Sequence, residues 1–389
     1  MPKKSGLSDR DPAADLLRII AVLFVIGIHF SIYTDFYKAP IDCPRMTVML
    51  FIRSACAACV PLFLTLSGYL MTNKRLSRSY YRGVGKTYFT YVVAGLCCML
   101  LYPALYGWLR PVLGLKEQTF SEVRFSDVVW KTLSFKSAPY AWYVEMYLGL
   151  FLLMPFLNVL YHGLDSRRRK RLLLATLFVI ACLPSLLNVY DFTDPGWWSN
   201  PSSSESWQKL IPSFWYLCYP LFYYFLGSYI REYGIRMKPW QAALGFVGSC
   251  LTAGFYNLWR SAGVPFQSGE WTDWQSALLV PMDWFLFAFF TNLRTEKMPG
   301  ALRWCAARLS GLCLGIYLTS WIFENLFYKV VKGMVPEIRD RLEVFFWMVP
   351  LVFVCSAVLS YAIQKLYALW SFLRRAAVRR LRRAKPETT

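Results

Sequence analysis

The sequence predicts an all-α protein, a polytopic membrane bundle of about ten transmembrane helices. Three observations support this fold class. The 389 residues are 56% hydrophobic and only 17% charged, a composition too apolar for a water-soluble protein of this length. Apolar runs of about 20 residues, each long enough to span a bilayer, recur along the chain. Lys and Arg are concentrated in every second loop between these runs, as the positive-inside rule requires.

The ten predicted spans succeed one another through mostly short loops. The first has no small-residue cleavage site at its end and carries Arg18 and His29, so we interpret it as a retained span, not a signal peptide. In the second span, Pro61 is expected to kink the helix and Gly68 to allow a neighbouring helix close approach. The predicted spans are approximately residues 15–34, 46–72, 87–108, 140–162, 172–190, 211–230, 240–259, 274–293, 309–328 and 345–370.

The positions of Lys and Arg predict the orientation of the bundle. With the N-terminus in the cytoplasm, the cytoplasmic segments carry most of the basic residues, and both termini are cytoplasmic. The net charge of +20 then lies on one face of the membrane. We assign residues 1–372 to one membrane domain and 373–389 to a basic tail that contacts anionic membrane lipids. Because the basic residues are scattered over membrane-flanking loops, we expect no nucleic-acid partner.

Two polar residues in the first span are the most informative feature for function. Arg18 and His29 are eleven residues apart in an otherwise apolar run. Eleven helical steps turn about 1100°, so both side chains share one face, roughly 16 Å apart along the axis. Such groups are costly in lipid and usually face the bundle interior or a wet cavity. They therefore indicate either a site that grips an anionic ligand and does proton chemistry at its far end, or polar contacts between helices.

Further polar residues are expected at the depth of His29. His29 lies about five residues, or roughly 8 Å, below the outer membrane surface. Glu145 at the start of the fourth span and Glu324 near the end of the ninth lie at a similar depth, and Arg53 is about one turn deeper. A carboxylate beside an imidazole fixes its tautomer. Either Glu145 or Glu324 could orient His29, and we prefer Glu145, although a structural salt bridge, for instance between Arg53 and Glu145, is an equal alternative.

The loop after the second span is strongly basic. It contains Lys74, Arg75, Arg78, Arg82 and Lys86, which suit either a phosphate-binding rim or simple positive-inside topology. The cysteines fall mainly within apolar spans. No second cysteine pair or nearby histidine completes a metal site with Cys56 and Cys59, so we expect no metal.

Several motifs together resemble the acyltransferase-3 family of integral membrane O-acyltransferases, in the family's order and over nearly the whole chain. The matching residues are Arg18 and His29, Pro61-Leu62-Phe63 with Ser67-Gly68-Tyr69-Leu70, the region of Arg82 and Lys86, Trp142-Tyr143 with Pro155, and Gly315-Ile316-Tyr317-Leu318. The resemblance implies a bacterial inner-membrane enzyme that moves acetyl or other short acyl groups from coenzyme A to hydroxyls of envelope glycans.

The resemblance also implies roles for particular residues. His29 would be the catalytic base, acting with Arg18 and Glu145. Arg82 and Lys86 would match the family's basic motif near the coenzyme entrance, and we expect Arg18 and Arg75 of the basic loop to bind the coenzyme with them. Acetyl-CoA or another acyl-CoA would be the co-substrate, and an envelope glycan or lipid-linked saccharide the acceptor.

The chain departs from the family's pattern at two places. Many relatives have a histidine after the Gly-Ile-Tyr-Leu run, where this chain has Thr319 and Ser320. Gly83 and Gly85 loosen the spacing of the basic motif.

Charged residues within the membrane also suit a transporter or flippase of a lipid-linked glycan. A transporter needs no thioester, so dependence on the coenzyme discriminates the two. A non-catalytic envelope scaffold leaves Arg18 and His29 unexplained.

Overall fold

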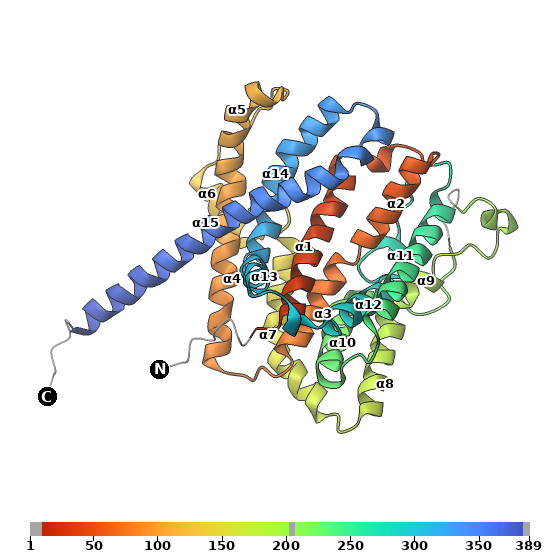
Figure 1. Cartoon of the computed structure of the whole chain (residues 1–389), viewed down its shortest axis with the longest axis horizontal. Helices are drawn as coiled ribbons and strands as arrows, with labels where there is room; N and C mark the ends of the chain where they lie inside the picture. Colours follow the sequence, from red (N-terminus) through yellow and green to blue (C-terminus); the bar gives the residue numbers. More distant parts are fainter. Residues whose placement is uncertain (1–9, 202–206, 384–389) are drawn as a thin grey trace.

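The computed structural model describes residues 10–201 and 207–383, with side chains described up to residue 375. These residues form helices and loops. Their β pairing consists of two isolated bridges, Pro40 with Pro265 and Ile41 with Ala262, which tie together two loops at one end of the bundle (Figure 1). The all-α prediction is therefore confirmed. Residues 384–389 of the predicted basic tail lie outside the described part of the chain.

A helix accompanies every predicted span. The α-helices are α1 (Pro12–Tyr33), α2 (Pro44–Cys56), α3 (Cys59–Met71), α4 (Arg78–Leu96), α5 (Tyr102–Leu113), α6 (Phe125–Leu133), α7 (Trp142–Gly163), α8 (Arg167–Leu177), α9 (Pro184–Leu187), α10 (Tyr219–Tyr233), α11 (Pro239–Ser261), α12 (Leu279–Thr291), α13 (Gly300–Ser310), α14 (Cys313–Met334) and α15 (Leu342–Arg383). Single π-helical turns, η3 (Cys97–Leu101) and η4 (Phe178–Cys182), link α4 to α5 and α8 to α9.

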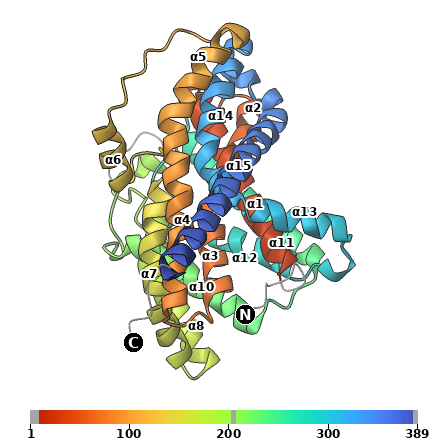
Figure 2. The ribbon, with the colours of Figure 1, turned by 90° about the vertical axis from the view of Figure 1, so that its left-hand side faces the viewer.

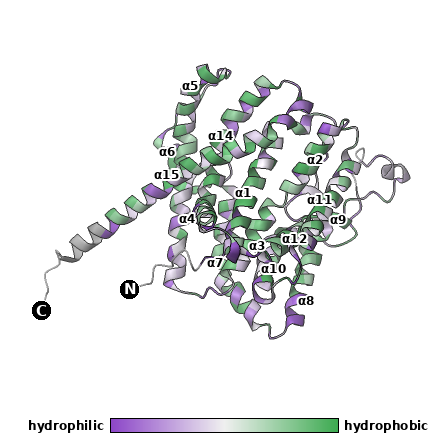
Figure 3. Cartoon of the chain, in the orientation of Figure 1, coloured by the Kyte–Doolittle hydropathy of each residue, from purple (hydrophilic) through white to green (hydrophobic). Residues whose placement is uncertain are grey.

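Five helical segments of the described chain are long and apolar enough to cross a bilayer. They are Pro12–Tyr33, Pro44–Met71, Arg78–Leu113, Trp142–Gly163 and Leu342–Arg375. The pair α13 and α14, bent by 67° at its break, would make a sixth, and α12 is a shorter apolar helix. Figure 3 shows hydrophobic residues along the middle of the bundle and hydrophilic ones toward the lower ends of α4 and α8. The helices are thus compatible with a membrane bundle, and the count of ten spans stays a prediction.

Helix α1 lies at the centre of the bundle. It packs against α2, α3, α12, α13, α14 and α15 (Figures 1 and 2). Its start is fixed locally, because the Asp11 carboxylate accepts hydrogen bonds from the backbone N–H groups of Ala13 and Ala14, and Pro12 occupies the first helical position. The central place of α1 explains why Arg18 and His29 meet other helices and not lipid.

Helix α15 is the longest element. Its first half packs along α14, where the Ser360 hydroxyl donates to the Leu312 carbonyl at 2.8 Å. Tyr367 and Trp370 further along α15 contact Phe89 of α4, and only the last turns of the helix leave the bundle and end on the side where α1 begins (Figure 1). The predicted boundary between residues 372 and 373 falls within this continuous helix, next to the exposed residues Arg374 and Arg375.

Two glycines bring the backbones of α3 and α10 into contact. A methyl group on Gly68 would lie 1.8 Å from the Tyr224 carbonyl oxygen, and one on Gly227 would lie 1.9 Å from the Thr65 carbonyl oxygen. Neither neighbour is a flexible side chain, so the helices would have to separate. Close approach through small residues is how membrane helices gain packing energy without a hydrophobic driving force.

We expect Gly68→Ala to destabilise the protein by about 1–3 kcal/mol, the usual cost of overpacking a close contact. Thermal unfolding in detergent measures this change. The matched control is Gly248→Ala in α11, where an added methyl group has no heavy atom within 4 Å. Equal melting temperatures for the two variants would contradict the contact between α3 and α10.

Candidate active site

His29 forms a buried polar cluster with Glu324 of α14 and with Tyr140, which directly precedes α7. Its Nδ1 lies 3.2 Å from the carboxylate of Glu324, which is fully buried in α14. The Tyr140 hydroxyl, from the segment before α7, donates to the same carboxylate. Because a carboxylate only accepts hydrogen bonds, the His29 Nδ1 carries the proton in the neutral imidazole. The Nε2 lone pair is then available as a base.

Aromatic packing fixes the plane of the imidazole. The rings of His29 and Tyr140 stack with centroids 4.0 Å apart, and the Tyr33 ring meets His29 edge-on at 6.4 Å. Tyr140 is held in turn by Tyr317 of α14, whose hydroxyl donates to the Tyr140 carbonyl oxygen at 2.6 Å. Only 13% of the His29 side chain is exposed. The imidazole is therefore oriented by both a carboxylate and a stacked ring.

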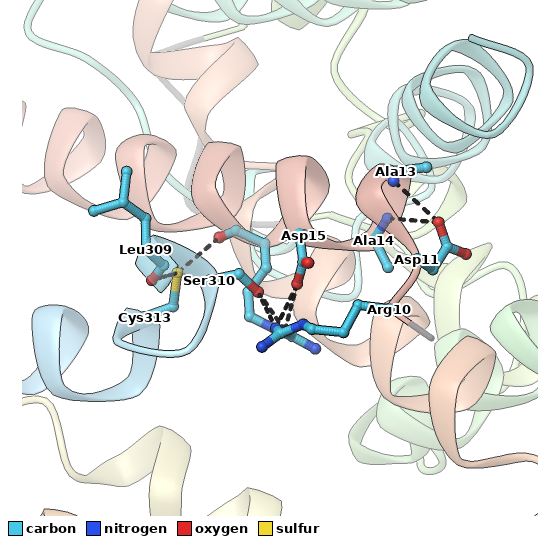
Figure 4. A network of polar contacts seen from close by, with 9 residues as sticks. Arg10, Asp11, Ala13, Ala14, Asp15, Leu309, Ser310 and Cys313 are labelled. Carbon is cyan, nitrogen blue, oxygen red and sulfur yellow. Dashed lines mark hydrogen bonds and ion pairs between the residues drawn. The ribbon is translucent and has the colours of Figure 1, made fainter. Parts of the chain in front are cut away.

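Arg18 belongs to a separate polar network at the other end of α1. Its Nη1 donates to the Ser310 hydroxyl at 2.5 Å and lies 3.6 Å from the Asp15 carboxylate. Arg10 donates to Asp15 at 2.7 Å and to Ser310 at 3.5 Å (Figure 4). Two guanidinium groups thus meet one carboxylate, which leaves excess positive charge in this network. Ser310 is available because α13 ends at the 67° bend before α14.

A cavity of about 210 Å³ leads from Arg18 into the bundle between α1, α3, α4, α7 and α14. Its walls are mainly apolar and aromatic, and Tyr143, Tyr147 and Tyr317 line it. Tyr317 also contacts Tyr140, which stacks on His29, so a chain of aromatic contacts joins the inner end of the cavity to the imidazole. This arrangement places a cation at one end of an apolar cavity and a base beyond the other.

The structure separates the predicted coenzyme-binding residues. Arg75, Arg82 and Lys86 are all exposed. Lys86 lines a second cavity between α4, α14 and α15, and Thr87 and Leu314 line both this cavity and the first. Arg75 lines a different depression, next to Asn158 and His162.

The expectation that Glu145 orients His29 is corrected, because Glu324 does so. Glu145 is exposed on the first turn of α7. Tyr143 and Tyr147, two residues on either side of it, line the cavity; two helical steps turn about 200°, so Glu145 points away from the cavity. The alternative pairing of Arg53 with Glu145 is also wrong. The Arg53 Nε donates to the Tyr37 hydroxyl at 3.1 Å, and its guanidinium lies 4.6 Å from the Phe266 ring centroid.

Sequence reasoning missed four residues at the site. Tyr317 lies in the Gly-Ile-Tyr-Leu run and Tyr140 is the first residue of the predicted fourth span, but nothing in their spacing shows that Tyr140 stacks on His29 or that Tyr317 contacts Tyr140. Ser310 and Asp15 as partners of Arg18 were missed as well. Asp15 is three residues from Arg18, a spacing that places two side chains on one face of a helix.

Among the described residues, no group of three His, Cys, Asp or Glu side chains is placed to hold a metal ion. The cysteines are free thiols, and Cys56 and Cys59 are buried. The site thus consists of a base oriented by a carboxylate and of a cavity that carries an arginine, which together suit proton abstraction from a hydroxyl near an anionic ligand.

Comparison with known proteins places the chain in a family. Its sequence matches the model of the acyltransferase domain over residues 11–365, nearly the whole chain. Neither curated proteins nor solved structures show a match. The matched region contains Arg18, the His29 cluster and the cavity between them. The chain belongs to the acyltransferase-3 family and is an acyltransferase of the membrane.

Proposed function

We propose that this protein moves an acetyl or other short acyl group from cytosolic acyl-CoA to a hydroxyl of an envelope glycan or lipid-linked saccharide. The observation that carries the proposal is the oriented base: His29 is held by Glu324 and Tyr140 beyond the inner end of the cavity that begins at Arg18. Family membership supplies the class of reaction, and the apolar cavity that begins at Arg18 supports the proposal that the donor binds there. The donor, the acceptor and the bacterial inner membrane as the site of action are parts of this proposal.

The donor is a polyanion with a long flexible arm. Arg18, with Arg10 beside it, lies at one cavity and the exposed Lys86 at the other, and the two cavities share Thr87 and Leu314 in their walls. If this end of the bundle faces the cytosol, as we propose, the phosphates would be attracted there. The mainly apolar wall between Arg18 and Tyr317 suits the pantetheine arm and the thioester. The thioester carbon would then approach the His29 cluster.

The chemical step is an acyl transfer assisted by a general base. The His29 Nε2 takes the proton of the acceptor hydroxyl as its oxygen attacks the thioester carbonyl carbon. A new C–O ester bond forms, the C–S bond breaks, and the coenzyme thiolate recovers a proton from the imidazolium. Glu324 stabilises the imidazolium that forms between these steps, because its carboxylate already accepts from Nδ1.

An acceptor reaching the site from the outer face would be modified without export of the coenzyme. His29 lies near the end of α1 opposite Arg18, so donor and acceptor would use different ends of the same bundle. Incubating the purified protein with labelled acetyl-CoA and crude envelope glycan, followed by mass analysis, tests the proposal directly. Acyl transfer to glycan supports it, and glycan movement without any need for a thioester supports a transporter.

We expect His29→Ala to lower acyl transfer by about 10²–10⁴-fold, the usual contribution of a general base. Release of free coenzyme thiol measures the rate. Normal expression and thermal stability of the variant would show that the loss is chemical. Turnover equal to that of the wild type would remove His29 from the mechanism.

We expect Glu324→Gln to lower kcat by about tenfold or more, because the amide cannot stabilise the imidazolium as a carboxylate does. Glu145→Gln is the matched control, since that carboxylate is exposed and turned away from the cavity. Steady-state kinetics of the two purified variants measure the difference. A larger loss for Glu145→Gln than for Glu324→Gln would contradict the pairing seen here.

We expect Arg18→Ala to raise KM for acetyl-CoA more than it lowers kcat, because Arg18 lies far from the thioester. Removing one charge-assisted contact to a phosphate costs about 1.5–3 kcal/mol, or roughly 10- to 150-fold in binding. Ser310→Ala keeps the charge and removes only the neutral partner, so its KM should change little. If Arg18→Ala instead melts earlier with an unchanged KM, Arg18 is a structural contact.

A further inference from the structure

Two stacked tryptophans, one of them at the start of α7, take no part in the proposed chemistry. Trp142 is the first residue of α7, two residues after Tyr140, whose ring stacks on His29. The indole of Trp142 is nearly parallel to that of Trp274, with an angle of 11° and centroids 6.1 Å apart. Trp274 belongs to the segment between the short helix η7 (Glu270–Thr272) and α12. Trp142 is 39% exposed, so an aromatic face is open next to the site.

A carboxylate belongs to the same segment as Trp274, and a guanidinium acts on it electrostatically. Asp273 immediately precedes Trp274, and Gln275 donates to its carboxylate at 3.4 Å. Loss of hydration raises the pKa of the Asp273 carboxyl, while the hydrogen bond from Gln275 and the nearby charge of Arg53 oppose the rise. Arg53 itself is buried and held by the Tyr37 hydroxyl and the Phe266 ring. The buried guanidinium of Arg53 therefore acts electrostatically on the carboxylate of Asp273, the residue that precedes Trp274.

These elements come from four parts of the chain that meet at one end of the bundle. Tyr37 follows α1, Arg53 is in α2, Trp142 begins α7, and Phe266 and Trp274 lie between α11 and α12. The bridges between Ile41 and Ala262 and between Pro40 and Pro265 join two of these segments. The same end carries His29. This end of the bundle thus carries partly exposed indole rings and, on the residue next to one of them, a carboxylate that can accept hydrogen bonds.

That combination suits a hydroxyl-rich ring. A flat aromatic face packs against the C–H face of a pyranose, while carboxylate oxygens accept hydrogen bonds from vicinal hydroxyls. We infer that Trp142, Trp274 and Asp273 form a subsite for the saccharide acceptor, next to the base that deprotonates its hydroxyl. This inference rests on the proposed function. It assigns the acceptor to the end of the bundle opposite Arg18, with stacking on Trp142 placing the reactive hydroxyl toward His29.

The test uses the full-length protein in lipid nanodiscs, with labelled acetyl-CoA and neutral oligosaccharides released by mild acid from bacterial envelope polysaccharide. Trp142→Ala, Trp274→Ala and Asp273→Asn should each raise KM for the oligosaccharides by about three- to tenfold, the range for loss of one aromatic or polar contact. KM for acetyl-CoA and the hydrolysis of acetyl-CoA without saccharide should not change. Trp142→Phe keeps an aromatic face and should restore most of the affinity.

Trp347→Ala is the matched control. Trp347 is 77% exposed near the start of α15, and Phe345 at the same end packs against Phe30, the neighbour of His29. A membrane-surface anchor would behave as Trp347 does, so equal KM values for Trp347→Ala and Trp142→Ala would overturn the subsite. So would a loss of thermal stability with an unchanged saccharide KM.

Failure of the proposed function gives a different result. If the wild type hydrolyses acetyl-CoA through His29 but acetylates none of the oligosaccharides, the saccharide is the wrong acceptor class and the subsite falls with it. If the wild type acetylates them and the Trp142, Trp274 and Asp273 variants keep the wild-type KM, the function stands and the subsite is wrong.

Discussion

The buried carboxylate of Glu324 is the constraint on which the active-site end of this bundle depends. A carboxylate taken out of water is costly unless hydrogen-bond donors surround it. Glu324 is fully buried and accepts from the imidazole of His29 and the hydroxyl of Tyr140. Satisfying it therefore brings α1, α14 and the start of α7 together. The hydrogen bond from His29 to Glu324 offsets part of the cost of burying the carboxylate, and it leaves the Nε2 atom of His29 available as a base.

The packing around Tyr140 links that cluster to the rest of the site. Its ring lies on the imidazole, its hydroxyl serves Glu324, and its carbonyl accepts from Tyr317. Tyr317 then forms part of the cavity wall that extends toward Arg18. One residue thus couples the orientation of the base to the end of the proposed donor cavity. This coupling is rigid because each group has a defined partner, which is the form of preorganisation that favours proton transfer.

A break between two helices shapes the end of the bundle that carries Arg18. The break between α13 and α14 turns α13 by 67°, so that Ser310 meets Arg18. A straight span through this region would carry Ser310 onward along the axis of α14, away from α1. Arg10 and Asp15 complete the network, and the two guanidinium groups outnumber the single carboxylate. The excess charge lies where a polyanionic donor would arrive.

The sequence by itself determined the fold class, the positions of most helices and the importance of Arg18 and His29. Apolar runs of bilayer length and the eleven-residue spacing are local properties, and local helical geometry converts them directly into shape. The sequence also predicted that a carboxylate lies beside His29, because the depth of a residue in the membrane follows from its position within a span. The wrong carboxylate was preferred: Glu145 and Glu324 lie at similar depth, and depth does not tell which way a helix is rotated.

Only the tertiary structure decided how each helix is rotated about its axis, and therefore which side chains pair with one another. Glu145 faces outward because the bulky tyrosines on either side of it fill the cavity wall, whereas Glu324 faces α1. Arg53 finds Tyr37 and Phe266 in loops whose paths no periodic pattern specifies. The bend at Ser310 and the stacking of Tyr140 likewise arise from contacts between segments distant in the chain. Side-chain pairing across a bundle depends on how helices pack, and that is a property of all of them together.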